Sequence, residues 1–304
     1  MKLQTCYDAK NGIIITHYDK ATKIAHKAIE MLNSGLYPFD KENEFPELIL
    51  PQNIKANTLD HRKYLFWAVG MDSGAPSIEV YEGARKMVEQ HGTKNIFSMK
   101  KKSLREMVQQ NITGGVTARN NPVEAIYFNN NLLKQKYDGD PINIFKTNDV
   151  NEIIENICQF KSYGKGKSCL LIKNYVKFGY YTPENPFDYP IKPDRHTVRI
   201  SLSAGAITTE PQGIYRRDFL EDITRDLYRK VTSHEKIDPG DLNNAFWGIG
   251  SKLCFKRSLS ACKYYNCTLD CEFIPRLDTR GTFFDTRKNQ REETPSLFAH
   301  FGLE

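Results

Sequence analysis

A short segment that combines two glycines with two lysines is the first candidate for chemistry. It reads Gly164-Lys165-Gly166-Lys167-Ser168 and lies between two apolar helical patterns. Glycine tolerates positive φ and lets a backbone come close to a ligand, and the free N–H groups at the start of a helix favour a phosphate. The segment therefore favours a grip on a nucleic-acid backbone that is independent of base sequence. A plain turn, with glycines chosen for its geometry, is the alternative.

Four cysteines form the second candidate. Cys254, Cys262, Cys267 and Cys271 lie close together in the pattern C-x7-C-x4-C-x3-C, whereas the other three cysteines are scattered. Cysteines at this density in a reducing compartment usually ligate metal. Four thiolates suit an iron–sulfur cluster or a tetrahedral zinc ion, and four free thiols are the third interpretation.

The third candidate is an aspartate that follows a proline. Asp194 comes directly after Pro193 and opens a helical pattern, so its side chain can cap that helix. The N–H groups at a helix start also favour a negative charge. A carboxylate held in this way can stabilise positive charge that develops nearby.

Taken together, these segments resemble the helix-hairpin-helix DNA glycosylases, and in layout the iron–sulfur branch that includes endonuclease III and the adenine glycosylase. The resemblance covers about a fifth of the chain. From the hairpin glycines to Phe178-Gly179, the sequence aligns with the family pattern without an insertion or deletion. The positions that match the family are Gly164, Gly166, Phe178-Gly179, Asp194, His196, Arg199 and Ala204-Gly205.

The resemblance implies the function of each part. Residues 164–168 would grip duplex DNA, and Asp194 would be the catalytic carboxylate that stabilises an oxocarbenium-like sugar while a base is excised. The target nucleotide would be extruded from the stack. We expect structural or phosphate-facing roles for His196 and Arg199.

Some positions depart from the family pattern. Members that also cut the DNA strand use a lysine to form a Schiff base, and Ser168 stands at that position, so the resemblance implies a monofunctional glycosylase. Tyr163 stands where proline is usual. The family's C-x6-C-x2-C-x5-C spacing also differs from the spacing here, so a structural [4Fe–4S] cluster is favoured and zinc is the alternative.

The periodicity of apolar residues predicts a mainly α-helical fold. We expect the two-lobed helix-hairpin-helix glycosylase fold with a C-terminal four-cysteine loop. The predicted parts are a central lobe of residues 59–178, a second lobe of residues 1–58 with 179–273, and an extension of residues 274–304. The predicted helices are 20–32, 62–71, 77–90, 102–110, 122–137, 149–160, 167–178, 195–203, 218–231 and 239–249.

Composition is that of an ordinary globular chain. The net charge of +6 over 304 residues is only weak support for a polyanionic partner. No apolar run reaches the roughly 20 residues of a membrane helix, and the N-terminus lacks an apolar signal core. We therefore expect a cytoplasmic, nucleoid-associated monomer that binds double-stranded DNA and no membrane.

Two other functions are compatible with parts of this pattern. One is a non-catalytic helix-hairpin-helix DNA-binding protein, against which the spacing of Asp194 argues. The other is a glycosylase of RNA or free nucleosides, against which a duplex-gripping hairpin argues. The excised base is not predicted, although the aromatic loop of residues 180–193 is a candidate wall of the base pocket.

Overall fold

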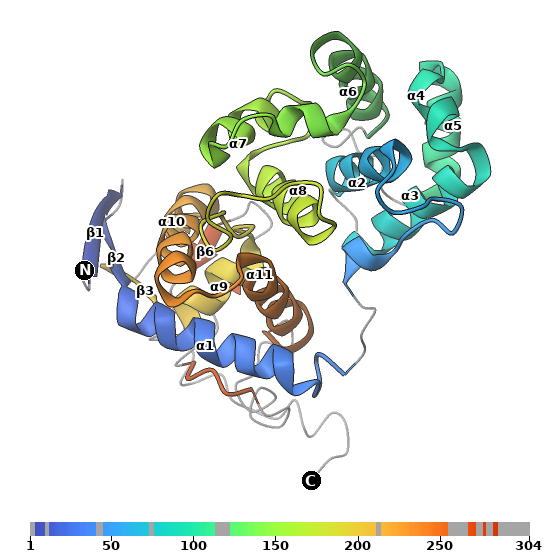
Figure 1. The fold of residues 1–304 in the computed structure, drawn as a ribbon. Helices are drawn as coiled ribbons and strands as arrows, with labels where there is room; N and C mark the ends of the chain where they lie inside the picture. The colour runs from blue at the N-terminus through green and yellow to red at the C-terminus, as the bar shows by residue number, and fades with distance from the viewer. Residues whose placement is uncertain are drawn as a thin grey trace, which may run out of the picture. The chain divides into compact units, whose positions relative to one another are not determined.

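The computed structural model describes residues 4–9, 12–40, 45–72, 76–112, 122–210, 214–254, 267–271, 276–277 and 282–284. Within these ranges the chain is mainly α-helical, with eleven α-helices and two small antiparallel sheets (Figure 1). The prediction of a mainly α fold is confirmed. None of the described helices is long and apolar enough to cross a membrane.

The chain forms two compact units. We call Asp40–Lys192 with Thr232–Asn244 the hairpin unit, and Met1–Phe39, Pro193–Val231 and Ala245–Glu304 the Asp194 unit. The predicted central lobe of residues 59–178 falls within the hairpin unit, which extends beyond it at both ends. Two helices, α10 (Arg217–Glu235) and α11 (Pro239–Gly248), contain a boundary between the units.

The hairpin unit is built around α2. Its other elements are η1 (Pro46–Leu48), α3 (Ser77–His91), α4 (Thr93–Ser98), α5 (Lys101–Asn111), α6 (Pro122–Lys136), η2 (Pro141–Phe145), α7 (Val150–Cys158) and α8 (Lys165–Lys177). Helix α2 (Leu59–Met71) is buried on all sides from Tyr64 to Met71, and packs against α3, α6 and α8. A helix that is apolar all round belongs in the centre of a core. Trp67 and Met71 are 4% and 5% exposed, which places both in this core.

Local sequence explains where these helices begin. Thr58 caps α2, because its Oγ1 accepts a hydrogen bond from the backbone N of His61 at 3.3 Å. Asp60 lies inside α2, in its first turn, so the helix begins three residues before the predicted start at residue 62. Asp149 caps α7, with its Oδ1 2.8 Å from the backbone N of Asn151.

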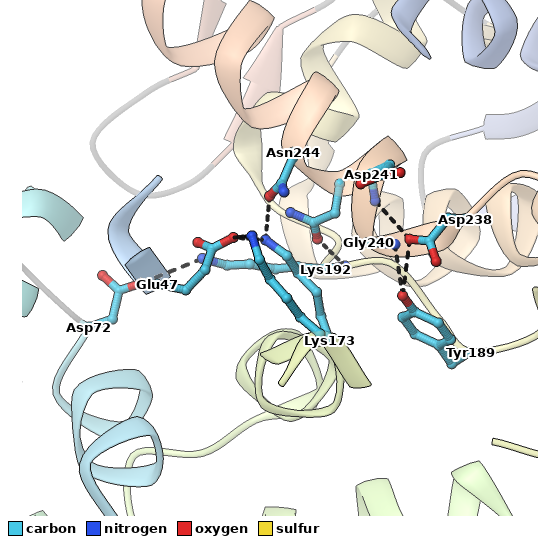
Figure 2. Close-up of polar contacts among 11 residues, drawn as sticks. Glu47, Asp72, Lys173, Tyr189, Lys192, Asp238, Gly240, Asp241 and Asn244 are labelled. Atoms are coloured by element: carbon cyan, nitrogen blue, oxygen red, sulfur yellow. Dashed lines mark hydrogen bonds and ion pairs between the residues drawn. The ribbon is translucent and has the colours of Figure 1, made fainter. Parts of the chain in front are cut away.

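A buried ion pair joins distant segments of the hairpin unit (Figure 2). The Nζ of Lys173 on α8 lies 2.6 Å from the Oε1 of Glu47 on η1, and it also donates to the Oδ1 of Asn244. Burial alone would raise the pKa of Glu47, but Lys173 outweighs burial and lowers it. The pair is therefore charged. Through Lys173 and its partners Glu47 and Asn244, it connects η1, α8 and the segment of residues 232–244.

The Asp194 unit combines helices with both sheets. Its further elements are β1 (Gln4–Ala9), β2 (Gly12–His17), α1 (Tyr18–Ser34), α9 (Arg195–Ser203), β3 (Ile207–Glu210), β4 (Ile214–Arg216), η3 (Ile249–Leu253), β5 (Arg276–Leu277) and β6 (Thr282–Phe284). Strand β2 pairs antiparallel with β1 and with β3, and β6 pairs antiparallel with β4 and β5. Periodicity did not predict these strands, because β3 reaches its partner from almost 200 residues away and the strands of the second sheet are only two or three residues long.

Candidate functional site

The hairpin lies between α7 and α8, and its glycines do not provide the positive φ of the turn. Helix α8 begins at Lys165 with Gly164 as its N-cap, so the helix starts two residues earlier than expected and Gly166 is inside it. The left-handed residue of the turn is Ser162, with φ of 68°, whereas Gly164 has an extended φ of −123°. Open space surrounds the place where a Gly164 side chain would be. What Gly164 provides is an unobstructed backbone at a helix start.

Tyr163 fixes the hairpin to the end of α2. Its ring stacks on Phe66 with a centroid separation of 5.1 Å, and its hydroxyl donates to the Phe66 carbonyl. A side chain at Gly70 would meet the same ring, with a Cβ only 3.1 Å from it. A buried tyrosine thus takes the position where the resembling family usually has proline, and it holds the turn by packing and a hydrogen bond.

The two lysines of the hairpin differ in their surroundings. Lys165 is exposed. Lys167 turns inward and donates from Nζ to the carbonyl of Gly70 at 2.7 Å. Burial lowers the pKa of Lys167 to about 8, with Asp72 opposing and Lys192 adding to the shift. Of the two hairpin lysines, Lys165 is therefore the one with an exposed side chain.

Ser168 is wholly buried. Its Oγ donates to the Gly164 carbonyl at 3.1 Å and lies 3.4 Å from the Sγ of Cys158. The predicted direct contact of Ser168 with DNA is thus wrong, because no part of its hydroxyl reaches the surface. The surface part of the predicted DNA-binding segment is Gly164, Lys165 and Gly166.

Asp194 is held at the start of α9 in the Asp194 unit. Its Oδ1 accepts hydrogen bonds from the backbone N of His196 at 2.8 Å and of Thr197 at 3.1 Å. The hydroxyl of Thr197 lies 3.3 Å from the same oxygen. These contacts fix the half-buried carboxylate at the positive end of a helix. Capping is therefore observed, and it leaves the predicted catalytic role compatible with the geometry.

The neighbours of Asp194 support α9 from within the unit. His196 packs against the backbone of Gly250 in η3, where an added Cβ would lie 2.4 Å from the Cβ of His196. Burial lowers the pKa of His196, and Asp194 only partly opposes this. Arg199 is 7% exposed, which favours the structural role over the phosphate-facing one.

Three of the four clustered cysteines lie in the described part of the chain. Cys254 follows η3 and is 4% exposed, and Cys267 and Cys271 are half-buried. Burial raises the pKa of Cys254 to about 12, with Cys267 adding to the rise and Arg199 opposing it. Burial likewise raises the pKa of Cys271, with Cys254 and Cys267 adding to it. The three thiols are thus near enough to act on one another electrostatically.

Cys262 lies outside the described residues. Among those that are described, no three His, Cys, Asp or Glu side chains converge closely enough to hold a metal ion. In chemical type the donors are those of a thiolate-bound centre, because four cysteines fall within 18 residues of sequence.

The aromatic loop after α8 is part of the core of the hairpin unit. Tyr181 and Tyr189 are 6% and 2% exposed, and Tyr189 donates to Asp238 and accepts from the backbone N of Gly240 (Figure 2). Tyr180 accepts from the backbone N of Asn57. The expectation that this loop forms the base pocket is therefore wrong for Tyr181 and Tyr189, since their rings already have partners in the core.

Sequence reasoning missed one residue that supports the hairpin. Asn129 of α6 is 2% exposed and bonds the backbone of Lys161 at both of its polar groups, 2.8 Å from N and 3.0 Å from O. Nothing in the run Asn129-Asn130-Asn131 distinguishes this side chain, because its partner is 32 residues away.

Comparisons with known proteins agree with this architecture. No family model matches the sequence, and no curated protein matches it. Among solved structures the chain is similar to endonuclease III, in a trapped covalent intermediate with DNA described as an estranged-adenine complex. The TM-score is 0.54 at 16% identity, over 83% of this chain and 95% of that one. At this identity the likeness shows the fold, and the chain has the helix-hairpin-helix fold of endonuclease III, as the sequence predicted.

Proposed function

We propose that the protein is a DNA glycosylase that excises a damaged, mismatched or modified base from duplex DNA. The observation that carries this proposal is the pairing of an open hairpin with a capped aspartate at the family's spacing, on the fold of endonuclease III. The solved neighbour is itself a complex with DNA. The hairpin would grip the DNA backbone, and Asp194 would act on the sugar.

The hairpin supports the DNA-binding step. Gly164 leaves the first N–H groups of α8 open to a phosphate oxygen, and the exposed Lys165 adds positive charge beside them. Such contacts position a duplex without reading its bases. The anchoring of Tyr163 and Asn129 keeps the turn rigid, so little conformational entropy is lost on binding.

Asp194 supports the chemical step. Loss of the base leaves positive charge on the sugar, and a fixed carboxylate stabilises that charge without having to reorganise. The two backbone N–H groups on Oδ1 hold the carboxylate in place. A water molecule then completes the hydrolysis of the N-glycosidic bond.

We propose that this hydrolysis leaves the DNA strand uncut. Ser168 cannot form an imine, and it is buried. Lys167, the neighbouring amine, donates to the Gly70 carbonyl. We expect an intact abasic strand as the product, and no covalent adduct when borohydride is present during turnover. A trapped adduct that is absent from the Lys167→Ala variant would show that Lys167 attacks the sugar.

The four cysteines would hold one structural centre, a [4Fe–4S] cluster or, as the alternative, a zinc ion. When bound, such a centre would give the loop of residues 254–271 a fixed core. We propose further that the protein acts as a monomer on chromosomal DNA in the cytoplasm.

The test is an excision assay over a panel of duplex oligonucleotides, each with one damaged, mismatched or naturally modified base. Release of at least one base, followed by strand cleavage only after alkali or heat, supports the proposal. Tight binding to duplex DNA with no base released from the whole panel would instead favour a non-catalytic helix-hairpin-helix protein.

A further inference from the structure

The hairpin is joined directly to α6. Asn129 holds the Lys161 backbone with the two hydrogen bonds described above, so the first part of the turn is fixed against this helix. The Lys161 side chain is exposed. The positive charge of Lys161, at the start of the hairpin, is therefore held beside α6 within the hairpin unit.

Helix α5 brings two more cations to the same part of α6. Lys101 forms an ion pair with Glu124, and α5 packs against α6. Arg105 lies one turn after Lys101, so the two share a face of α5. Lys101 is the main cause that lowers the pKa of Glu124, and Lys161 and Arg105 lower it further. One carboxylate on α6 thus lies within electrostatic reach of three cations from two other parts of the chain.

This charge distribution is not explained by stability. The first turn of α5 carries Lys101 and Lys102 and no acidic residue, although the helix dipole favours acids there. The Lys101–Glu124 pair is exposed, with 46% and 29% of the side chains accessible, and such pairs stabilise a fold little. Three exposed cations around one carboxylate leave a net positive surface next to the hairpin.

We propose that Lys101, Arg105 and Lys161 bind the backbone phosphates of the DNA strand that continues past the hairpin, with Glu124 as the partner of Lys101 when DNA is absent. A phosphate offers Lys101 the same charge-assisted bond that Glu124 gives it. The surface formed by Lys101, Arg105 and Lys161 would extend the DNA contact from the hairpin to α5 and α6. This inference rests on the proposed function, because it takes the hairpin as the adjoining DNA contact.

The first experiment compares the affinity of the full-length protein for an undamaged duplex over a range of salt concentrations. We expect the double variant Lys101→Ala/Arg105→Ala to reduce the slope of log affinity against log salt by about one to two, since each phosphate contact contributes about 0.9. Lys86→Ala is the matched control, because Lys86 is an exposed lysine on α3. Equal slopes for the double variant and the control would overturn the proposal.

The second experiment uses Glu124→Gln, for which we expect the opposite effect. Removing this charge frees Lys101 and ends the repulsion of a phosphate, so affinity for the duplex should rise severalfold and the salt slope should steepen. A purely structural role of the Lys101–Glu124 pair predicts no gain, and an unchanged or weaker affinity would overturn the proposal. Thermal unfolding of each variant checks that the fold is retained.

A hairpin variant separates this inference from the proposed function. If Gly166→Asp loses affinity and the Lys101→Ala/Arg105→Ala variant does not, the surface inference fails while the hairpin contact stands. If neither change weakens duplex binding, the proposed function fails as well. Loss of binding to polyglutamate, but not to DNA, in the double variant would mean that the surface serves an acidic protein, and it would also overturn the inference.

Discussion

At the scale of single residues, Asp194 caps α9 with the same carboxylate to which we assign the proposed catalytic role. Its Oδ1 accepts from two backbone N–H groups at the start of α9. These bonds satisfy donors that a helix leaves open, and they also hold a carboxylate in one orientation. A residue that is already fixed loses no freedom when it acts on a transition state.

Replacing this charge should remove catalysis and leave the fold intact. We expect Asp194→Asn to lower the rate of base excision by a factor on the order of a thousand or more, because the positive charge on the sugar loses its partner. Asparagine caps helices as well as aspartate does, so DNA affinity and thermal unfolding should be unchanged. Single-turnover excision kinetics measure the effect, and near-normal turnover would contradict the catalytic assignment.

Lys167 makes the stability of the protein depend on pH. Its pKa is about 8 in the folded protein, below the ordinary lysine value, because it is buried. Between pH 8 and 10 the unfolded chain therefore binds a proton that the folded chain does not, and the free energy of unfolding rises with pH. The rise from this residue is at most about 2 kcal/mol over that window.

Unfolding by urea at several pH values tests this dependence. The Lys167→Met variant should lack this part of the rise, because methionine does not titrate. Lys165→Met is the control, since Lys165 is the exposed neighbour on the same helix turn. If both variants keep the slope of the unmodified protein, Lys167 is not the group responsible.

At the scale of elements, the hairpin is anchored to two neighbouring helices of its unit. Tyr163 joins it to α2 through Phe66 and Gly70, and Asn129 joins it to α6 through Lys161. The first N–H groups of α8 are therefore presented at a fixed place. Open space lies where a side chain of Gly164 would be, and in the proposed function a phosphate approaches the helix start there.

A negative charge at the start of α8 should weaken the binding of duplex DNA without destabilising the helix. Because Gly166 lies in the first turn of α8, Gly166→Asp adds an acid where the helix dipole favours one. We expect weaker binding to all duplex sequences alike and a flatter salt dependence, measured by fluorescence anisotropy. A loss confined to one sequence would instead mean that the hairpin reads bases.

At the scale of the whole molecule, long-range contacts define the two units. The hairpin unit takes in residues 232–244, and the buried bonds of Asn244 and Asp238 with Lys173 and Tyr189 connect that segment to the rest (Figure 2). The Asp194 unit collects its strands, α9 and the cysteines from three separate parts of the chain. Each unit is thus assembled from segments that are distant in sequence.

The cysteine loop should hold one metal centre. We expect protein purified without oxygen to be brown, with absorbance near about 400 nm, as thiolate-bound iron clusters show. Cys262→Ala should lower the iron content, while Cys6→Ala, at an exposed cysteine of β1, should not. One zinc per chain in colourless protein would favour the alternative, and protein without metal would favour free thiols.

The sequence by itself determined the helices and the order of the candidate residues. Apolar periodicity located ten of the eleven described helices, and α9 lies where it was expected, from Arg195 to Ser203. It succeeded because helical patterns and caps such as Asp149 are local in the chain. The spacing of Gly164, Gly166 and Asp194 likewise needed only the linear order of residues.

Only the tertiary structure decided which side chains face solvent and which are buried. Ser168 and Lys167 were expected at the DNA surface, but packing of α8 against α2 and α7 turned Ser168 into the core and directed Lys167 to the Gly70 carbonyl. Tyr181 and Tyr189 of the loop are core residues, and β3 pairs with β2 from far along the chain. Burial and strand pairing depend on contacts between distant segments, and such contacts leave no periodic signal in the sequence around one residue.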